Sequence, residues 1–209
     1  FQNLVGSTAP VNPVNADAAM EVTAQGDDAR IVLGKGEVTI AGFDQRVRLS
    51  SSGVIVAEGD GSLLVRSALT LDAPVITAGK FTAPRPSTSD LPKWTAASYA
   101  IMASNGAVTP VYYGVALTNS FGVPALAEPV LGGTITLTGG NIDIATNVAL
   151  PGGAFRVRAN GELTVGASAL LDASARTVDF RGVLAANSGG IIDLTATGAL
   201  SIASGATLR

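Results

Sequence analysis

At 209 residues, the chain is long enough for one or two domains, and 47% of its residues are hydrophobic although only 5% are aromatic. Its apolar content therefore comes from Ala, Val, Leu and Ile, which together with 25 glycines favour strands and tight turns over helices. A charged fraction of 14% is too low for a coiled coil, a formal net charge of −3 argues against a nucleic-acid binder, and no apolar run is long enough to span a membrane as a helix.

The chain contains neither cysteine nor histidine. This excludes disulfides, thiol chemistry, Ser-His-Asp and Cys-His catalysis and the usual zinc sites, and we expect no cofactor. The absence of cysteine also fits a large bacterial protein that crosses membranes unfolded during export.

Residues 1–28 are rich in Pro, Asn, Ala and Asp and show no period, which predicts an irregular lead-in with one strand at Met20–Thr23. The sequence starts at Phe1 without a signal-peptide pattern, so we expect a processed chain or an excised fragment. We also expect the natural protein to continue beyond Arg209, because the repeat described next ends in mid-pattern.

Residues 29–83 and 130–209 carry a repeated unit, Gly-x-Φ-x-Φ, in which Φ is aliphatic or Phe. The alternation predicts short strands with one apolar and one polar face, and the leading glycine is interpreted as supplying backbone freedom for a corner. The copies begin at Gly36, Gly61, Gly133, Gly140, Gly153, Gly161, Gly190 and Gly198.

The spacing of these copies predicts how the strands stack. Copies come in pairs, and the pairs repeat, since Gly133 and Gly140 are followed by Gly153 and Gly161 at an interval of about 20 residues. We therefore predict an all-β fold, a right-handed parallel β-helix with coils of about 20 residues, in two blocks at 29–83 and 130–209. Strands at this spacing also fit an antiparallel sandwich or barrel, but hairpin proteins do not require the same pair of units to return at a fixed interval.

The apolar positions of the units predict the interior of the β-helix. Third-face strands are expected at Ala169–Ser174 and, by the same pattern, at Ala68–Ala73, whereas the register through Asp172–Gly189 stays open. The predicted interior positions are Ile135, Leu137, Ile142, Ile144, Phe155, Val157, Leu163, Val165, Ile192, Leu194, Leu200 and Ile202.

Between the two blocks, residues 84–129 differ sharply in composition and are predicted to form an excursion from the β-helix. They hold six of the ten prolines, the only tryptophan and all three tyrosines. Aromatic rings with polar tips suit contacts to sugars or proteins, although they also suit packing of the excursion onto the β-helix. The candidate partner-contact residues are Trp94, Tyr99, Tyr112 and Tyr113.

Two local structures fit the excursion. Asp90 is a candidate N-cap for a helix over Leu91–Ser104 that stops at Asn105-Gly106, and this is the preferred prediction. The rival is a hairpin turning at Asn105-Gly106, with Ser98–Ala103 and Ala107–Leu117 as its arms.

The stretch Gly190-Ile-Ile-Asp-Leu-Thr-Ala-Thr-Gly-Ala-Leu-Ser-Ile-Ala-Ser-Gly-Ala-Thr-Leu208 resembles the filamentous haemagglutinin-like family of two-partner-secreted exoproteins, and Leu69-Thr-Leu-Asp-Ala-Pro-Val-Ile-Thr-Ala78 is similar to the family's recurrent coil. The resemblance implies a long fibre on the surface of a Gram-negative bacterium, exported through an outer-membrane secretion partner. Asn12-Pro-Val-Asn15 lacks the context of the family's secretion domain, so the resemblance implies an internal segment joined to flanking β-helix.

Function is predicted to be structural and adhesive, without catalysis, with a glycan or protein receptor as partner and no insertion into a membrane. Because parallel β-helices include polysaccharide lyases and hydrolases, a carbohydrate-active enzyme is the alternative, but the close acidic pairs Asp27-Asp28 and Glu58-Gly-Asp60 are interpreted as solvated turn residues. A self-assembling extracellular filament subunit is the third hypothesis.

Overall fold

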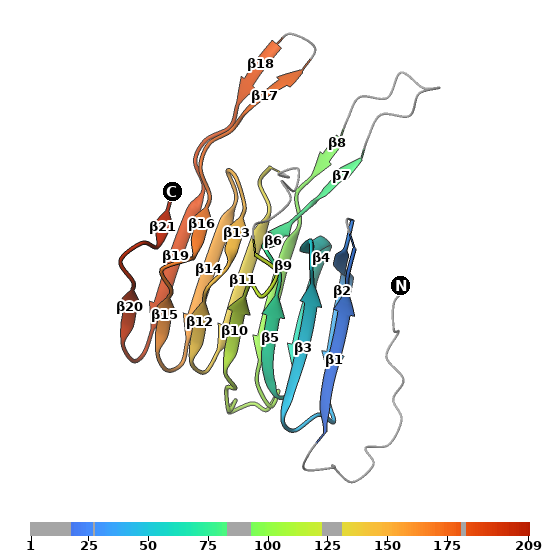
Figure 1. Ribbon diagram of the computed structural model, residues 1–209, viewed down its shortest axis with the longest axis vertical. Helices are drawn as coiled ribbons and strands as arrows, with labels where there is room; N and C mark the ends of the chain where they lie inside the picture. The colour runs from blue at the N-terminus through green and yellow to red at the C-terminus, as the bar shows by residue number, and fades with distance from the viewer. Residues whose placement is uncertain (1–17, 27, 83–92, 123–130, 181–182) are drawn as a thin grey trace.

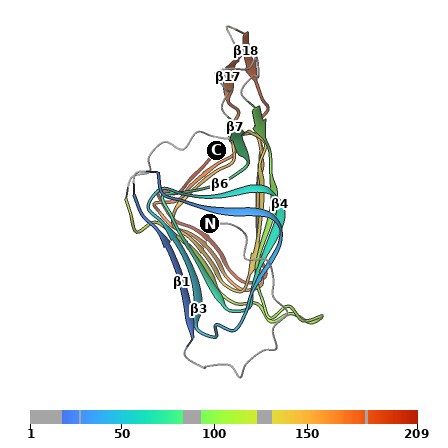
Figure 2. The same ribbon diagram turned by 90° about the vertical axis from the view of Figure 1, so that its right-hand side faces the viewer.

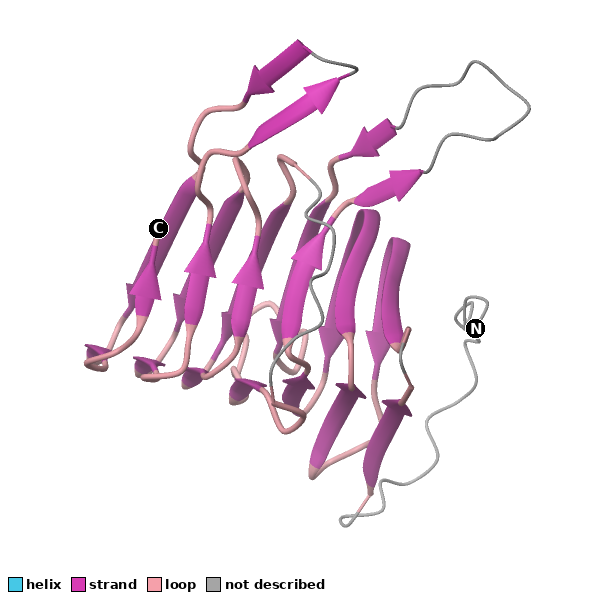
Figure 3. Ribbon diagram, turned by 45° about the horizontal axis from the view of Figure 1, so that its top comes forward, coloured by secondary structure: helices cyan, strands magenta, loops and turns pink. Residues whose placement is uncertain are grey.

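A computed structural model describes residues 18–26, 28–82, 93–122, 131–180 and 183–209. None of these residues forms an α-helix, and the strands are stacked side by side along the molecule (Figures 1 and 3). The prediction of an all-β chain built from parallel strands is confirmed, because every pairing within the two large sheets is parallel.

The first sheet has seven strands that follow one another in chain order along the stack. In spatial order they are β1 (Ala19–Ala24), β3 (Arg46–Ser51), β5 (Ala68–Asp72), β10 (Val115–Thr118), β12 (Ile142–Ile144), β15 (Leu163–Val165) and β20 (Leu200–Ile202).

The second sheet has ten strands and divides into two branches. Its long strands are β2 (Arg30–Ile40) and β4 (Val54–Val65), and the first half of β4 pairs with β6 whereas its second half pairs with β9. Branch one continues through β6 (Val75–Ala78), β13 (Asn147–Ala149), β16 (Leu170–Asp172) and β21 (Thr207–Leu208). Branch two continues through β9 (Ser98–Ala103), β11 (Thr134–Gly139), β14 (Ala154–Ala159) and β19 (Ile191–Ala196).

The chain visits the first sheet, branch one and branch two in turn, as in the path β12, β13, β14, β15. Seen along the stack, successive circuits lie over one another around a three-sided outline (Figure 2). Ile135 of one circuit pairs with Phe155 of the next, and Ile142 pairs with Leu163 in the same way. The register predicted from the 20-residue glycine spacing is therefore the register of these strands. The 37-residue interval from Gly153 to Gly190, whose length predicts two circuits of 18 or 19 residues, is instead a single circuit, because β14 pairs directly with β19.

The core lies inside this outline, and its aliphatic side chains come from alternate positions of all three sets of strands. Of the predicted interior positions, those on β11, β12, β14 and β15 are buried, whereas Ile192 and Leu194 are half-buried. Leu200 and Ile202 are 47% and 49% exposed. The difference arises because β19 and β20 are the last strands of their ladders, so no described strand covers them on one side.

The glycine that opens several repeat units is required for space. A Cβ on Gly190 would lie 1.9 Å from the carbonyl oxygen of Gly153, which is closer than any real Cβ contact. Gly190 is not among the glycines with a positive φ, so the interpretation as a source of backbone freedom is wrong at this position. The stacked circuits approach too closely here for any side chain.

The prediction that residues 84–129 form an excursion without strands of the stack is wrong in part. The preferred helix over Leu91–Ser104 is wrong, because the described residues of that range form strands β8 and β9. β9 and β10 lie within that range and pair with strands on both sides in the two large sheets. The unit was missed because β9 is preceded by Ala97 in place of glycine. Asp90, the proposed N-cap, lies outside the described residues.

The rival hairpin is also wrong, although its first arm has the bounds of β9. β9 pairs in parallel with β4 and β11, and its antiparallel links to the following segment are confined to its C-terminal end: the isolated bridge from Ser104 to Tyr112 and the backbone hydrogen bonds from Tyr113 to Ala103 and from Asn105 to Val111. The expected equivalence of Ala68–Ala73 and Ala169–Ser174 fails as well, because β5 belongs to the first sheet and β16 to branch one. Both segments alternate in the same way, and alternation does not say which sheet a strand joins.

Two antiparallel hairpins leave the stack. β7 (Lys80–Thr82) pairs with β8 (Lys93–Thr95), and β17 (Thr177–Phe180) pairs with β18 (Val183–Ala186). The second hairpin explains why no register could be predicted through Asp172–Gly189: the described residues between β16 and β19 are not part of the parallel ladders.

Candidate functional site

The four predicted contact residues do not form one cluster. Tyr99 points into the core from β9, is 2% exposed, and has a pKa raised by burial. Tyr99 is therefore a core residue: its ring packs inside the stack and offers no surface to a partner. The polar tip of its ring and its position among the aromatic residues of 84–129 make Tyr99 a contact candidate in the sequence, but its place in the alternation Tyr99, Ile101, Ala103 is the signal that marks it as interior.

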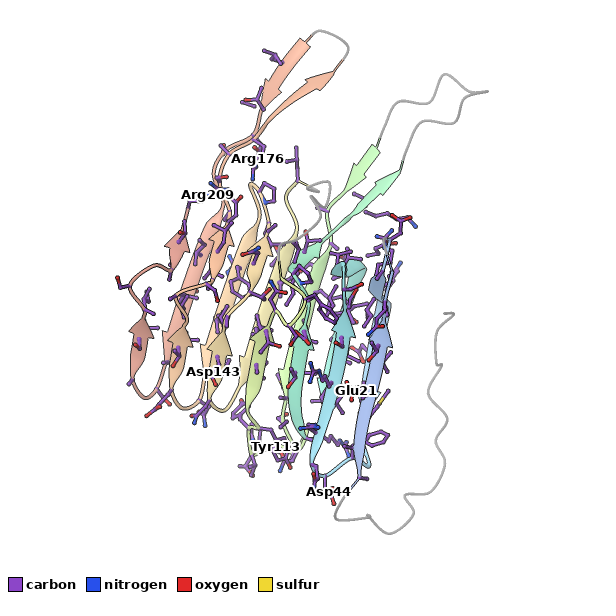
Figure 4. The ribbon with its side chains drawn as sticks, viewed as in Figure 1. Glu21, Asp44, Tyr113, Asp143, Arg176 and Arg209 are labelled. Atoms are coloured by element: carbon purple, nitrogen blue, oxygen red, sulfur yellow. The ribbon has the colours of Figure 1, made fainter. Side chains whose placement is uncertain are left out.

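The other three aromatic residues lie outside the stacked strands. Trp94 is on β8, where the register places it opposite Phe81 of β7. Tyr112 and Tyr113 are half-buried in the connection from β9 to β10, and Tyr113 packs against the core. In Figure 4 Tyr113 lies at the end of the molecule opposite the β7–β8 hairpin, so the structure separates Trp94 from the two tyrosines.

Both hairpins project from one corner of the stack. Each interrupts the passage from a branch-one strand to a branch-two strand: β7–β8 lies between β6 and β9, and β17–β18 lies between β16 and β19. Figures 1 and 2 show them leaving on the same side of the molecule. We name the two together the hairpin corner.

The base of the β7–β8 hairpin is fixed to the neighbouring circuit by carboxylates of β4. Glu58 accepts a hydrogen bond of 2.6 Å from the Arg30 guanidinium and lies 3.5 Å from the Lys80 ammonium at the start of β7. Asp60 accepts a hydrogen bond of 2.8 Å from the backbone N–H of Ser98, just beyond β8. The hairpin is thus held on both sides of its base.

The base of the β17–β18 hairpin is fixed by a buried carboxylate of β16. Asp172 is 4% exposed, and its Oδ2 accepts hydrogen bonds from Arg176 at 2.6 Å and from Arg209 at 3.1 Å. Burial raises the pKa of Asp172, but hydrogen bonds from Ser174 and Arg209 and the charge of Arg176 outweigh burial and hold it below its ordinary value. Asn187, after β18, accepts a 2.6 Å hydrogen bond from the Arg176 backbone N–H and closes the base.

The β17–β18 hairpin was not predicted, although the sequence contains its signal. Thr177–Phe180 and Val183–Ala186 are two short β-prone runs separated by the dipeptide Arg181-Gly182, which is the spacing of a tight hairpin. The hairpin contains no copy of the glycine-led unit, so a search for that repeat does not find it.

The connection from β9 to β10 carries a second exposed feature, a loop tip clamped by Asn105. The Asn105 side-chain oxygen accepts hydrogen bonds from the backbone N–H groups of Ala107 at 3.1 Å and Val111 at 3.0 Å. The clamped tip exposes Val108 fully and Val111 by 58%.

A buried polar group ties three strands of the first sheet together. Asp72 on β5 is fully buried; it accepts hydrogen bonds from Arg48 and Ser50 of β3, from Thr118 of β10 at 3.0 Å and from the Ser120 backbone N–H at 2.9 Å. Burial raises the pKa of this carboxyl, but the hydrogen bonds from Arg48, Ser120 and Thr118 outweigh burial and hold its pKa below the ordinary value. With every donor supplied by a neighbouring strand or loop, this group stabilises the stack.

The outer faces of the stack carry polar side chains in register, as in the column Thr136, Arg156 and Asp193 across β11, β14 and β19. Among the described residues, no group of three or more acidic side chains is placed to hold a metal ion. The described part of the chain also contains no helix long and apolar enough to cross a membrane.

Comparison with known proteins finds no matching family model, no matching curated protein and no matching solved structure.

Proposed function

We propose that this chain is a segment of right-handed parallel β-helix that serves as a structural and adhesive part of a secreted bacterial surface fibre, without catalysis. The observation that carries the proposal is the repeated circuit through three sets of parallel strands, in which each strand pairs with its equivalent in the next circuit. A circuit of this kind extends a chain along one axis with a continuous apolar interior, which suits a stalk.

The composition supports the same function. Short outward side chains offer little area for a desolvated anchor, so the faces of the stack suit a spacer better than a binding surface. The sequence resemblance to filamentous haemagglutinin-like exoproteins supports a fibre on the surface of a Gram-negative bacterium, exported through an outer-membrane partner, with flanking β-helix on the same polypeptide.

Within this fibre segment, the hairpin corner is the proposed contact for a glycan or protein receptor. Hairpins on a rigid scaffold are where binding residues gather, and the bases of both are fixed by carboxylates of the stack. β7–β8 is the favoured arm because it carries Trp94, the only tryptophan of the chain.

The test removes one hairpin at a time. Residues 81–94 are replaced by a short Gly-Ser linker, which keeps Lys80 and its ion pair to Glu58 and leaves β9 in place. The matched control replaces 178–185 and keeps the pair Thr177 and Ala186 with the Arg176–Asn187 base.

We expect both variants to keep the β-sheet circular dichroism spectrum, and only the 81–94 variant to lose adhesion to cells and immobilised glycans. Adhesion that survives in both variants would show that the contact lies elsewhere. Loss of the β spectrum in the 81–94 variant would show that the hairpin is part of the folding core.

A further inference from the structure

The dipeptide Asn-Gly occurs at two places that differ in their surroundings. Asn105-Gly106 lies in the loop tip between β9 and β10, and Asn160-Gly161 follows β14 directly. An asparagine before glycine is open to attack by its own backbone, because glycine brings no side chain into the way and lets the chain bend. In that attack the glycine nitrogen bonds to the asparagine Cγ and closes a cyclic imide.

The stack holds Asn160-Gly161 between neighbouring circuits. The backbone N–H of Asn160 donates a 2.8 Å hydrogen bond to the carbonyl of Gly139, and the carbonyl of Gly161 accepts one of 2.8 Å from Gly198. A Cβ on Gly161 would lie 2.2 Å from the side-chain oxygen of Asn141, so the contact between circuits is close. Ring closure at Asn160 therefore requires the circuits to separate.

Asn105-Gly106 lies beyond the parallel ladders, which end at Ala103. Gly106 has a φ of 71°, and every residue from Gly106 to Pro110 is exposed. The Gly106 N–H donates a hydrogen bond of 3.3 Å to the Ser104 hydroxyl, which is long for such a bond. Little structure has to be broken before this nitrogen can react.

The clamp made by Asn105 favours the attack. Its side-chain oxygen accepts a 3.1 Å hydrogen bond from the backbone N–H of Ala107, two residues ahead, which folds the carboxamide back over the Gly106 peptide. This oxygen gains negative charge when the nitrogen bonds to Cγ. The N–H groups of Ala107 and Val111, the latter at 3.0 Å, already point at it and stabilise that charge.

Arg66 places a positive charge beside the reacting nitrogen. A Cβ on Gly106 would lie 3.4 Å from Nε and 3.5 Å from Nη2 of Arg66, so the guanidinium lies against Gly106. A neighbouring cation favours the nitrogen after it has lost its proton, and it also favours the carboxylate that the reaction produces.

We propose that Asn105 is a site of spontaneous deamidation in the folded chain, promoted by the backbone N–H groups of Ala107 and Val111 and by the charge of Arg66. The Gly106 nitrogen gives its proton to hydroxide and bonds to Cγ, the bond from Cγ to the side-chain nitrogen breaks, and ammonia leaves with a proton from water. Water then opens the imide at either carbonyl and leaves aspartate or isoaspartate. The balance is one water consumed and one ammonia released.

The modification changes the loop tip. In isoaspartate the main chain runs through Cγ, so the oxygen that clamps Ala107 and Val111 becomes part of the backbone and the clamp is lost. A negative charge is added at the base of the tip that exposes Val108 and Val111. The inference rests on this local geometry and is independent of the proposed function.

The test compares the two Asn-Gly sites in the folded full chain and in the same chain in urea. Samples are kept in mildly alkaline heavy-oxygen water, so that only deamidation during the incubation is labelled, and are then digested with trypsin. The sites fall in separate peptides, 94–156 and 159–176, and fragmentation locates the labelled residue.

In urea we expect the two sites to react at similar rates. In the folded chain Asn105 should react at least as fast as in urea and faster than Asn160 by about tenfold or more, because Asn160 reacts only after the stack opens. An Asn105 that reacts more slowly in the folded chain than in urea, or no faster than folded Asn160, would overturn the proposal.

Arg66→Gln tests the electrostatic part. It should slow the folded-state reaction of Asn105 several-fold and leave the rate in urea unchanged, because the guanidinium lies against Gly106 only in the fold. Lys35→Gln is the matched control: it removes one exposed positive charge between the two halves of β2 and should leave both rates unchanged. Equal folded-state rates in the wild type and Arg66→Gln, with the β spectrum intact, would overturn the role given to Arg66.

Discussion

The side of the strand on which a residue lies decides whether its side chain is buried in this chain. Phe155 on β14 is 2% exposed and lies in register between Ile135 and Ile192, whereas its neighbour in the ladder, Thr136 of β11, is on the outer side. A charge tolerated on one side of a strand is therefore costly one position away.

We expect Phe155→Asp to lower the free energy of unfolding by several kcal/mol, because it buries an unpaired carboxylate among aliphatic side chains. Thr136→Asp should cost about 0.5 kcal/mol or less, because Thr136 lies on the outer side of β11, is only half-buried and pairs in register with Arg156. Urea denaturation of the two variants and the wild type measures both. Equal losses would mean that the inner and outer faces are misassigned.

Asp72 should make stability depend on pH. Its folded-state pKa is lowered, so its carboxylate contributes stability above the unfolded pKa of about 3.9, and this contribution is lost as pH falls through the folded pKa. Asp72→Asn should be less stable than the wild type at pH 7 and should lose less stability between pH 7 and pH 3. Asp143→Asn, on the exposed side of β12, is the control and should keep the wild-type pH dependence in urea melts.

At the scale of elements, the close stacking of successive circuits imposes a steric requirement on the residue before a strand. A Cβ at Gly190 would overlap the carbonyl oxygen of Gly153, whereas a Cβ at the adjacent Gly189 would meet nothing within 4 Å. Two neighbouring glycines therefore have opposite tolerance of a side chain.

Gly190→Ala should lower the free energy of unfolding by about 1–3 kcal/mol, since β14 and β19 must move apart to admit the methyl group. Gly189→Ala should change it by about 0.5 kcal/mol or less. Urea denaturation measures the free energy of unfolding of both variants. A Gly190→Ala variant as stable as the wild type would mean that the circuits do not approach as closely as described.

The whole molecule behaves as a row of circuits, each stabilised by its neighbours. Strands in the middle of the row are covered on both sides, whereas β20 and β21 are covered on one side and expose their inward residues. Local stability should therefore fall from the middle of the row toward its ends.

Amide hydrogen exchange followed by mass spectrometry should show this gradient. We expect peptides from β20 and β21 to exchange faster than peptides from β12 and β13. Uniform protection along the row would indicate that the chain unfolds as a single cooperative unit.

The sequence by itself determined the strand class, the inner and outer faces of the repeat units, and the offset of about 20 residues between circuits that contain no hairpin. These follow from local alternation and from the recurrence of one glycine-led unit, because positions that recur once per circuit must meet when strands stack in parallel. The pairing of Ile135 with Phe155 follows from this recurrence alone.

Only the tertiary structure decided which segments belong to the stack. β9 and the strands of the β17–β18 hairpin are all short β-prone runs, and only the two-residue spacing of β17 and β18 favours pairing with a neighbour; alternation alone does not reveal whether a run pairs with a distant strand. The same limit applies to Tyr99, whose burial comes from β4 and β11 on either side, and to Gly190, whose lack of a side chain is explained by the carbonyl group of Gly153 in the neighbouring circuit. Pairing partners and close approaches are long-range properties, and the physical reason for each of these residues lies in another circuit.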